Sequence, residues 1–305
     1  MTMKPAVVMV GAALLVAVPF AAELGGQTAA KPAPVPSMVP YGQLGGCSEK
    51  PAEFHPCALE KAKTFNPPRM PDGTPDFQGN WARSRVSTDD LEEHLSLYLR
   101  DDPGGVTMIV DPPDGKVPYQ PWAAAVKPTH RPKYRDPQSS CFLPSPPRQA
   151  YGPMGFQILR APGSITFLQE QSHAYRFIPL DGRPHIPPGI LLGYGDSRGH
   201  WEGNTLVLDV TNMRSQNWFD HAGNFYSPNV HIVERWTMIA PDAIHYTATL
   251  TDPKVYTRPW TIAIPIRRNN DPNYELMESA CIEGARIEFT DLGLKSFPYH
   301  GEKIP

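Results

Sequence analysis

From residue 156 onward, apolar and polar residues alternate with a period of two. The alternation is clearest in residues 244–251 and 260–266, and it recurs in residues 164–170, 174–178 and 205–211. Alternate side chains of a strand point to opposite faces, so this pattern indicates strands with one apolar face and one wet face. Such strands are typical of an antiparallel sheet.

Short turn sequences separate the predicted strands. They are Ala161–Gly163, Leu180–Gly182, Gly203–Asn204 and Ala240–Asp242, and each is typical of a hairpin connection. Six or more sequential strands with one buried face must curl or be covered, and few helices are predicted to cover them. We therefore expect a mostly β fold whose antiparallel sheet forms a closed or nearly closed barrel, or is at least strongly curled.

One short helix is predicted, beginning after Ser87 or Thr88. Acidic residues follow directly, where they suit the positive end of the helix dipole, and apolar residues from Leu91 to Leu99 share one face. The sequence Asp101–Gly105, which contains proline and two glycines, ends this helix.

The N-terminus has the pattern of a secretory signal peptide. Lys4 precedes an apolar run from Ala6 to Ala22, and small residues at positions 28–30 suit cleavage after Ala30. We therefore expect residues 1–30 to be removed on export to the periplasm or the medium. No later apolar run approaches the roughly 20 residues of a membrane span, so no span is expected in the mature chain.

Proline accounts for 37 of the 305 residues and is concentrated in residues 31–40, 112–147 and 184–188. Because proline lacks a backbone donor, these stretches are expected to be linkers or surface coverings. Residues 31–70 are interpreted as a loosely attached Pro-rich arm, and residues 71–305 as a single β-rich domain. The net charge of -3, with mixed signs, argues against a nucleic-acid partner.

Four cysteines in an exported chain indicate two disulfides, because that compartment is oxidising. Three connectivities are open. The preferred one joins Cys47 to Cys57 in a short local loop and Cys141 to Cys281 across most of the domain. A zinc site at the cysteines is disfavoured because no C-x-x-C spacing occurs.

Several motifs resemble a family of exported bacterial proteins of uncharacterised function. The main ones are WEGNTLVLDVTN (201–212), HIVERWTM (231–238) and TLTDPKVYTRPWT (249–261). Further matches are PDGTPDFQGNW (71–81), CFLPSPPRQA (141–150), LDGRPH (180–185) and ESACIEG (278–284). The tryptophan, turn and Thr-Leu-Val strand also resemble lipocalin-like proteins, which implies a calycin-type barrel with an internal pocket.

The candidate catalytic residues are Asp181, His185, His231 and Glu234, because histidine and carboxylate can exchange protons with a substrate. Asp181 could equally bond its own backbone in an Asp-Gly turn. His231 and Glu234 are three residues apart on one strand, so they point to opposite faces and cannot share a metal unless the strand bulges between them. We expect no metal site.

Glu234 lies in register with Ile232 and Trp236, so we expect it on the apolar face of its strand. A carboxylate there must either pair with a buried arginine, with Arg176, Arg183 and Arg198 as possible partners, or act as a general acid or base.

The candidate substrate-binding residues lie around the same turns and strands. They are Arg183, His200, Trp201, Glu202, His221, Trp236 and Tyr246. Arg183 and Glu202 could instead be surface ion pairs, and the histidines ordinary loop residues.

Two functions follow from these residues. The leading hypothesis is an exported, cofactor-independent acid–base enzyme, a lyase, isomerase or hydrolase that acts on a small organic molecule. No nucleophile elbow, zinc-protease motif, phosphate loop or dinucleotide fingerprint is present, so no organic cofactor is expected. The alternative is a non-catalytic lipocalin-like carrier of an apolar or aromatic ligand, because the inward faces are rich in such residues. A structural protein of the envelope is the third possibility.

Overall fold

The computed structural model describes residues 41–83, 88–93, 105–140, 142–277, 279 and 295–296. Within these residues, ten strands form one antiparallel sheet, which confirms the predicted mostly β fold. The strands are β3 (Gly79–Arg83), β4 (Ile109–Asp111), β6 (Phe156–Ala161), β7 (Ser164–Gln169), β8 (Tyr175–Pro179), β9 (Asp196–Glu202), β10 (Thr205–Thr211), β11 (His231–Ala240), β12 (Ala243–Thr251) and β13 (Trp260–Arg268).

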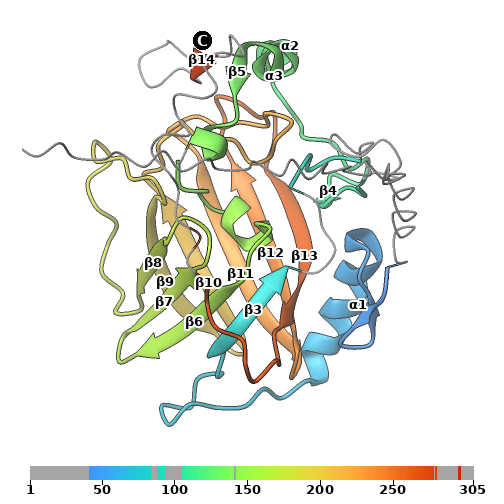
Figure 1. Cartoon of the computed structure of the whole chain (residues 1–305), viewed down its shortest axis with the longest axis vertical. Coiled ribbons are helices and arrows are strands. Elements are labelled where there is room, and N and C mark those ends of the chain that lie inside the picture. The colour runs from blue at the N-terminus through green and yellow to red at the C-terminus, as the bar shows by residue number, and fades with distance from the viewer. Residues whose placement is uncertain are drawn as a thin grey trace, which may run out of the picture. The chain divides into compact units, whose positions relative to one another are not determined.

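The sheet is a nearly closed barrel (Figure 1). Its strand order is β8-β7-β6-β3-β13-β12-β11-β10-β9, with β4 paired to β13 beside this path. Its two edge strands, β8 and β9, lie against each other without being paired in the sheet. This arrangement is consistent with the predicted lipocalin-like barrel.

We call the contact between β8 and β9 the seam. Neighbours along the path are all antiparallel and the path has an odd number of strands, so β8 and β9 run in the same direction. Strands that run in the same direction cannot be joined by a tight hairpin. The Pro- and Gly-rich residues 180–195 make the longer connection between them.

Side chains close the seam in place of backbone hydrogen bonds. Arg176 on β8 donates from Nε to the hydroxyl of Ser197 on β9, 2.9 Å away. Gly199 on β9 has no side chain, and a Cβ there would lie 2.5 Å from Cδ2 of Leu180 and 3.0 Å from Cγ2 of Ile178. The glycine therefore lets the two strands approach closely.

The alternating apolar residues fill the inside of the barrel, as predicted. The inward positions of β10, β11, β12 and β13 are in register and form rows of large side chains across the sheet. One such row consists of Leu206, Trp236, Tyr246 and Ile264. All four are buried. Burial of such side chains stabilises the fold by roughly 1.5–3 kcal/mol each.

The main described helix, α1 (Pro51–Thr64), lies within the expected arm and was not predicted. Pro51 occupies its first turn, where a missing N–H is tolerated, and buries against the fold together with Phe54 and Ala58. Phe54 and Ala58 belong to a second apolar cluster with Ile239 and Ala243 of the sheet. This segment therefore packs on the outside of the barrel (Figure 1).

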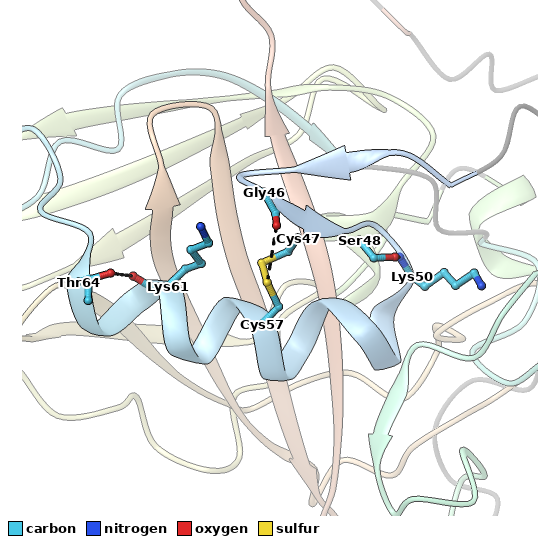
Figure 2. Close-up of a disulfide and its surroundings, with 7 residues drawn as sticks. All are labelled: Gly46, Cys47, Ser48, Lys50, Cys57, Lys61 and Thr64. Carbon is cyan, nitrogen blue, oxygen red and sulfur yellow. Dashed lines mark hydrogen bonds between the residues drawn. A yellow bond between two sulfur atoms is a disulfide. The ribbon is translucent and has the colours of Figure 1, made fainter.

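A disulfide holds α1 to the short strand pair that precedes it. Strands β1 (Gln43–Leu44) and β2 (Cys47–Ser48) form a hairpin, and Cys47 on β2 is bonded to Cys57 on α1. Figure 2 shows this bond beside the helix. The predicted Cys47–Cys57 pairing is confirmed, while the predicted Cys141–Cys281 pairing lies outside the described residues.

The helix predicted after Thr88 is not formed in residues 88–93, and residues 94–100 lie outside the described part of the chain. Tertiary partners use the backbone groups that a helix would need. The carbonyl of Thr88 accepts from the N–H of His221, and the carbonyl of Leu91 accepts from the N–H of Met108. The N–H of Leu91 donates to the carboxylate of Asp220.

The Pro-rich segment 112–151 contains only short elements. They are α2 (Pro121–Val126), α3 (His130–Lys133), η1 (Lys127–Thr129), η2 (Pro137–Ser140), η3 (Arg148–Tyr151) and β5 (Tyr134–Arg135), which pairs with β14 (Lys295–Ser296). Among the described residues, no helix is long and apolar enough to cross a membrane. The predicted signal peptide lies outside them.

Candidate functional site

A pocket of about 450 Å³ opens over the seam, where β8 and β9 begin. We call it the seam pocket. It is bordered on one side by residues 172–177 and on the other by residues 192–195, Ser197 and Leu143. The lining residues are Leu143, Ser172, His173, Ala174, Tyr175, Arg176, Phe177, Leu192, Gly193, Tyr194, Gly195 and Ser197.

The wall formed by β8 is aromatic and exposed. Tyr175 and Phe177 are 67% and 55% exposed, and Leu192 on the opposite side is 40% exposed. Tyr175 and Phe177 lie on one face of β8 and Arg176 on the other, as the alternation predicted. The aromatic pair, however, faces outward and the arginine inward, which reverses the usual arrangement of a barrel strand.

Two of the polar groups of the pocket are buried donors without a described partner. Arg176 is only 2% exposed, and no described residue accepts a hydrogen bond from its Nη1. The hydroxyl of Tyr194 is also buried without a hydrogen-bond partner among the described residues. Burial raises the pKa of Tyr194 despite the nearby positive charge of Arg176, so its phenol keeps its proton and can donate.

Behind the pocket, Arg176 forms an ion pair with Glu234, which is fully buried inside the barrel. The guanidinium Nη2 lies 2.5 Å from Oε2 of Glu234, and the hydroxyl of Tyr246 donates to Oε1 at 2.8 Å. Burial and the charge of Glu234 together raise the pKa of Tyr246 well above its usual value. The predicted inward position of Glu234 is confirmed, and of the two predicted arrangements the structure has the pairing with a buried arginine.

Two of the predicted catalytic residues meet on the outside of the barrel. His231 and His185 each place Nε2 within hydrogen-bond distance of one carboxylate oxygen of Asp209, at 2.9 Å and 2.8 Å. His185 also contacts Asp196 through Nδ1, at 2.7 Å. Burial raises the pKa of Asp209, but the hydrogen bonds from the two histidines outweigh it and lower that pKa below its usual value.

Glu234 does not join these histidines, because it lies on the opposite face of β11 from His231. Asp181 does not join them either. It accepts a hydrogen bond from the backbone N–H of Arg183, at 3.1 Å, and pairs with the guanidinium of the same residue on the surface. The structure therefore separates the four predicted catalytic residues into three places.

The predicted substrate-binding residues are also dispersed. His200 and Arg235 both contact the exposed carboxylate of Glu202, at 3.1 Å and 2.6 Å. Trp201 packs against Phe77, with ring centroids 5.6 Å apart. Trp236 and Tyr246 pack against each other in the core. None of the residues predicted as catalytic or substrate-binding lines the seam pocket.

His221 lies in a different polar cluster. Its Nδ1 contacts the carboxylate of Asp136, which also receives two hydrogen bonds from Arg148, at 2.9 Å and 2.6 Å. Burial opposes ionisation of Asp136, but Arg148 and His221 hold the pKa of its carboxyl well below its usual range. Nearby, burial and Asp90 raise the pKa of the fully buried Asp220 to about 6.

Sequence reasoning missed the seam pocket. The sequence suggests Arg176 only as a partner for Glu234 and suggests no role for Tyr194. The available signals were the Tyr-Arg-Phe order of β8, which carries a charge between two aromatics, and the sequence Gly193–Gly195, which surrounds Tyr194 with flexible backbone. No group of three or more His, Cys, Asp or Glu side chains within the described ranges could hold a metal ion.

Comparison with known proteins adds no assignment to this geometry. No protein-family model matches the chain, and neither a curated protein nor a solved structure matches it. The seam pocket and its donors are therefore the basis for assigning a function.

Proposed function

We propose that the protein binds a small aromatic or apolar molecule in the seam pocket. The observation that carries this proposal is the combination of an outward-facing aromatic wall with two buried donors that have no partner among the described residues. Ligand pockets are generally apolar cavities of roughly 300–1,000 Å³ with a few polar groups that fix orientation. The seam pocket, at about 450 Å³, falls within this range.

The aromatic wall supports the proposal energetically. Tyr175 and Phe177 expose more than half of their surface, and burial of apolar surface is favourable by roughly 25 cal/mol per Å². A ligand that covers both rings recovers part of this free energy. The site also lies where the sheet is not hydrogen-bonded, so a ligand can reach it without breaking strand pairing.

The lining also favours binding over catalysis. Among the described residues, the lining contains His173 but no carboxylate, and the carboxylate that Arg176 contacts, Glu234, is held by Arg176 and Tyr246. A general base needs hydrogen-bond reach to a substrate proton. Glu234 is already committed to two donors inside the barrel.

The test uses a glycine that faces open space in the pocket. A Cβ added at Gly193 would meet nothing within 4 Å, so Gly193→Phe should fill the pocket without strain. Gly189 has equally open surroundings but lies outside the pocket lining, which makes Gly189→Phe the matched control. Binding is measured by fluorescence titration with the neutral aromatic probe N-phenyl-naphthylamine.

We expect saturable probe binding to the wild type and to Gly189→Phe, and a loss of at least about tenfold in affinity for Gly193→Phe. Tyr175→Ala should weaken binding in the same direction. The proposal fails if the wild type shows no saturable binding, or if Gly193→Phe binds as tightly as its control.

A second candidate function is acid–base catalysis on the outer face of β10 and β11. The observation in its favour is that His185 and His231 both contact Asp209, an arrangement that could relay a proton to a small substrate. We expect Asp209→Asn to abolish any turnover of a panel of model esters and carbonyl compounds by the wild type. No turnover by the wild type would leave ligand binding as the proposed function.

A further inference from the structure

We infer that the ligand of the seam pocket is electrically neutral and carries a hydrogen-bond acceptor such as a carbonyl, and that Glu234 enforces this choice. The inference rests on the binding function proposed above. It names the chemical class of the ligand and the residue that determines specificity.

The need for an acceptor follows from the two donors. Nη1 of Arg176 and the hydroxyl of Tyr194 belong to residues that line the pocket, and both atoms are buried without a partner among the described residues. A buried donor that makes no hydrogen bond is unfavourable. A ligand acceptor near these atoms would satisfy one or both of them.

The need for neutrality follows from the charge balance. Arg176 and Glu234 are 2% and 0% exposed and form a compensated pair. Among the described residues that line the pocket, Arg176 is the only Lys, Arg, Asp or Glu side chain. A carboxylate ligand would therefore be a second anion sharing one buried cation, and desolvation of that extra charge would be unfavourable. A carbonyl accepts the same hydrogen bonds without adding charge.

The pair is also fixed in position. Tyr246 holds one oxygen of Glu234 at 2.8 Å, and Ser197 accepts from Nε of Arg176 at 2.9 Å. Neither side chain can turn away to release the guanidinium for an anion without breaking a second hydrogen bond. The site therefore disfavours anionic ligands, because they would add a second negative charge beside Arg176, and it favours neutral ligands through hydrogen bonds to the two donors.

The experiment compares three naphthalenes that carry substituents of similar size at the same ring position. Acetylnaphthalene is neutral and has an acceptor, naphthoate is anionic, and ethylnaphthalene has no acceptor. Their affinities are measured by displacement of N-phenyl-naphthylamine at pH 7.5. We expect the wild type to bind acetylnaphthalene at least about tenfold more tightly than naphthoate. In Glu234→Gln this preference should reverse, because the charge of Arg176 is then uncompensated.

Tyr194→Phe provides a test that leaves the buried ion pair intact. It should weaken binding of acetylnaphthalene severalfold and leave that of ethylnaphthalene unchanged, because only the former uses the hydroxyl. The inference is overturned if wild-type protein binds naphthoate as tightly as acetylnaphthalene, if a folded Glu234→Gln keeps the wild-type preference, or if Tyr194→Phe affects both neutral ligands equally. Failure of the proposed function itself would appear differently, as absence of saturable probe binding.

Discussion

At the scale of single residues, the main feature is the buried ion pair of Arg176 and Glu234 inside the barrel. Moving Arg176 and Glu234 out of water is costly, and hydrogen bonds from Arg176 and Tyr246 to the carboxylate offset this cost. Such a pair stabilises a protein little compared with well-packed apolar side chains. Removal of one partner alone is much more damaging, because it leaves the other charge buried and uncompensated.

Glu234→Leu should therefore lower the free energy of unfolding by roughly 3–5 kcal/mol. The double variant Arg176→Met/Glu234→Leu should recover most of this loss, because it removes both charges. Denaturant unfolding monitored by tryptophan fluorescence provides the measurement.

Glu202→Gln is the surface control, because Glu202 and Arg235 are each more than 40% exposed. It should change the free energy of unfolding by less than about 1 kcal/mol. A double variant no more stable than Glu234→Leu would contradict this account.

At the scale of elements, a disulfide joins α1 to the short strand pair β1–β2, and a pair of histidines joins α1 to the barrel. His55 on α1 places Nδ1 3.0 Å from Nε2 of His245 on β12, and Phe54 packs edge-on against the same ring. Burial, followed by the proximity of His55, lowers the pKa of His245 to about 3. The contact between helix and sheet therefore requires neutral histidine.

This contact should make stability depend on pH. The unfolded chain protonates His245 near pH 6.5, whereas the folded chain does so only near pH 3, so the unfolded state binds more protons between these values. Stability should therefore fall as the pH is lowered from about 6.5 towards 3. His245→Gln, which cannot titrate, should show a smaller fall between pH 7.5 and 4.5 in denaturant unfolding.

Asp220 contributes to the pH profile in the opposite direction. Its raised pKa, about 6, means that the folded state binds its proton more readily than the unfolded state, so this carboxyl favours folding as the pH falls. The effect is common to the wild type and to His245→Gln and cancels when the two are compared. Identical pH profiles for the two proteins would show that His245 does not sense pH.

At the scale of the whole described molecule, the barrel closes at the seam between β8 and β9. These two strands contact each other through side chains and are not paired by a backbone ladder. Elsewhere along the path, neighbouring strands share backbone hydrogen bonds. The seam, which lacks backbone ladder pairing, is also the site of the pocket. Close packing there depends on Gly199.

Gly199→Val should separate the two edge strands, because its Cβ would lie 2.5 Å from Leu180 and 3.0 Å from Ile178. We expect a loss of about 1–3 kcal/mol in the free energy of unfolding, together with weaker probe binding in the seam pocket. Calorimetric or denaturant unfolding checks the first expectation, and fluorescence titration the second. Gly189→Val, which meets nothing within 4 Å, is the control. Equal behaviour of the two variants would mean that Gly199 is not needed for closure.

The sequence alone determined the features that depend on neighbouring residues. Period-two alternation gave the strands and assigned Glu234 to the apolar face, because successive side chains must point to opposite faces. The local spacing of Cys47 and Cys57 gave the disulfide, and the Asp-Gly turn explained how Asp181 bonds the backbone of Arg183. Each of these follows from geometry within a few residues of the chain.

Tertiary structure decided what depends on distant partners. Alternation places Tyr175 and Phe177 on one face of β8 and Arg176 on the other, but it does not determine which face lies inside the barrel. Arg176 lies inside, where the carboxylate of Glu234 compensates its positive charge. The helical pattern after Thr88 gives way because distant residues take its backbone hydrogen bonds. The seam pocket exists only where β8 and β9 meet, and that meeting is fixed by closure of the entire barrel rather than by either strand's own sequence.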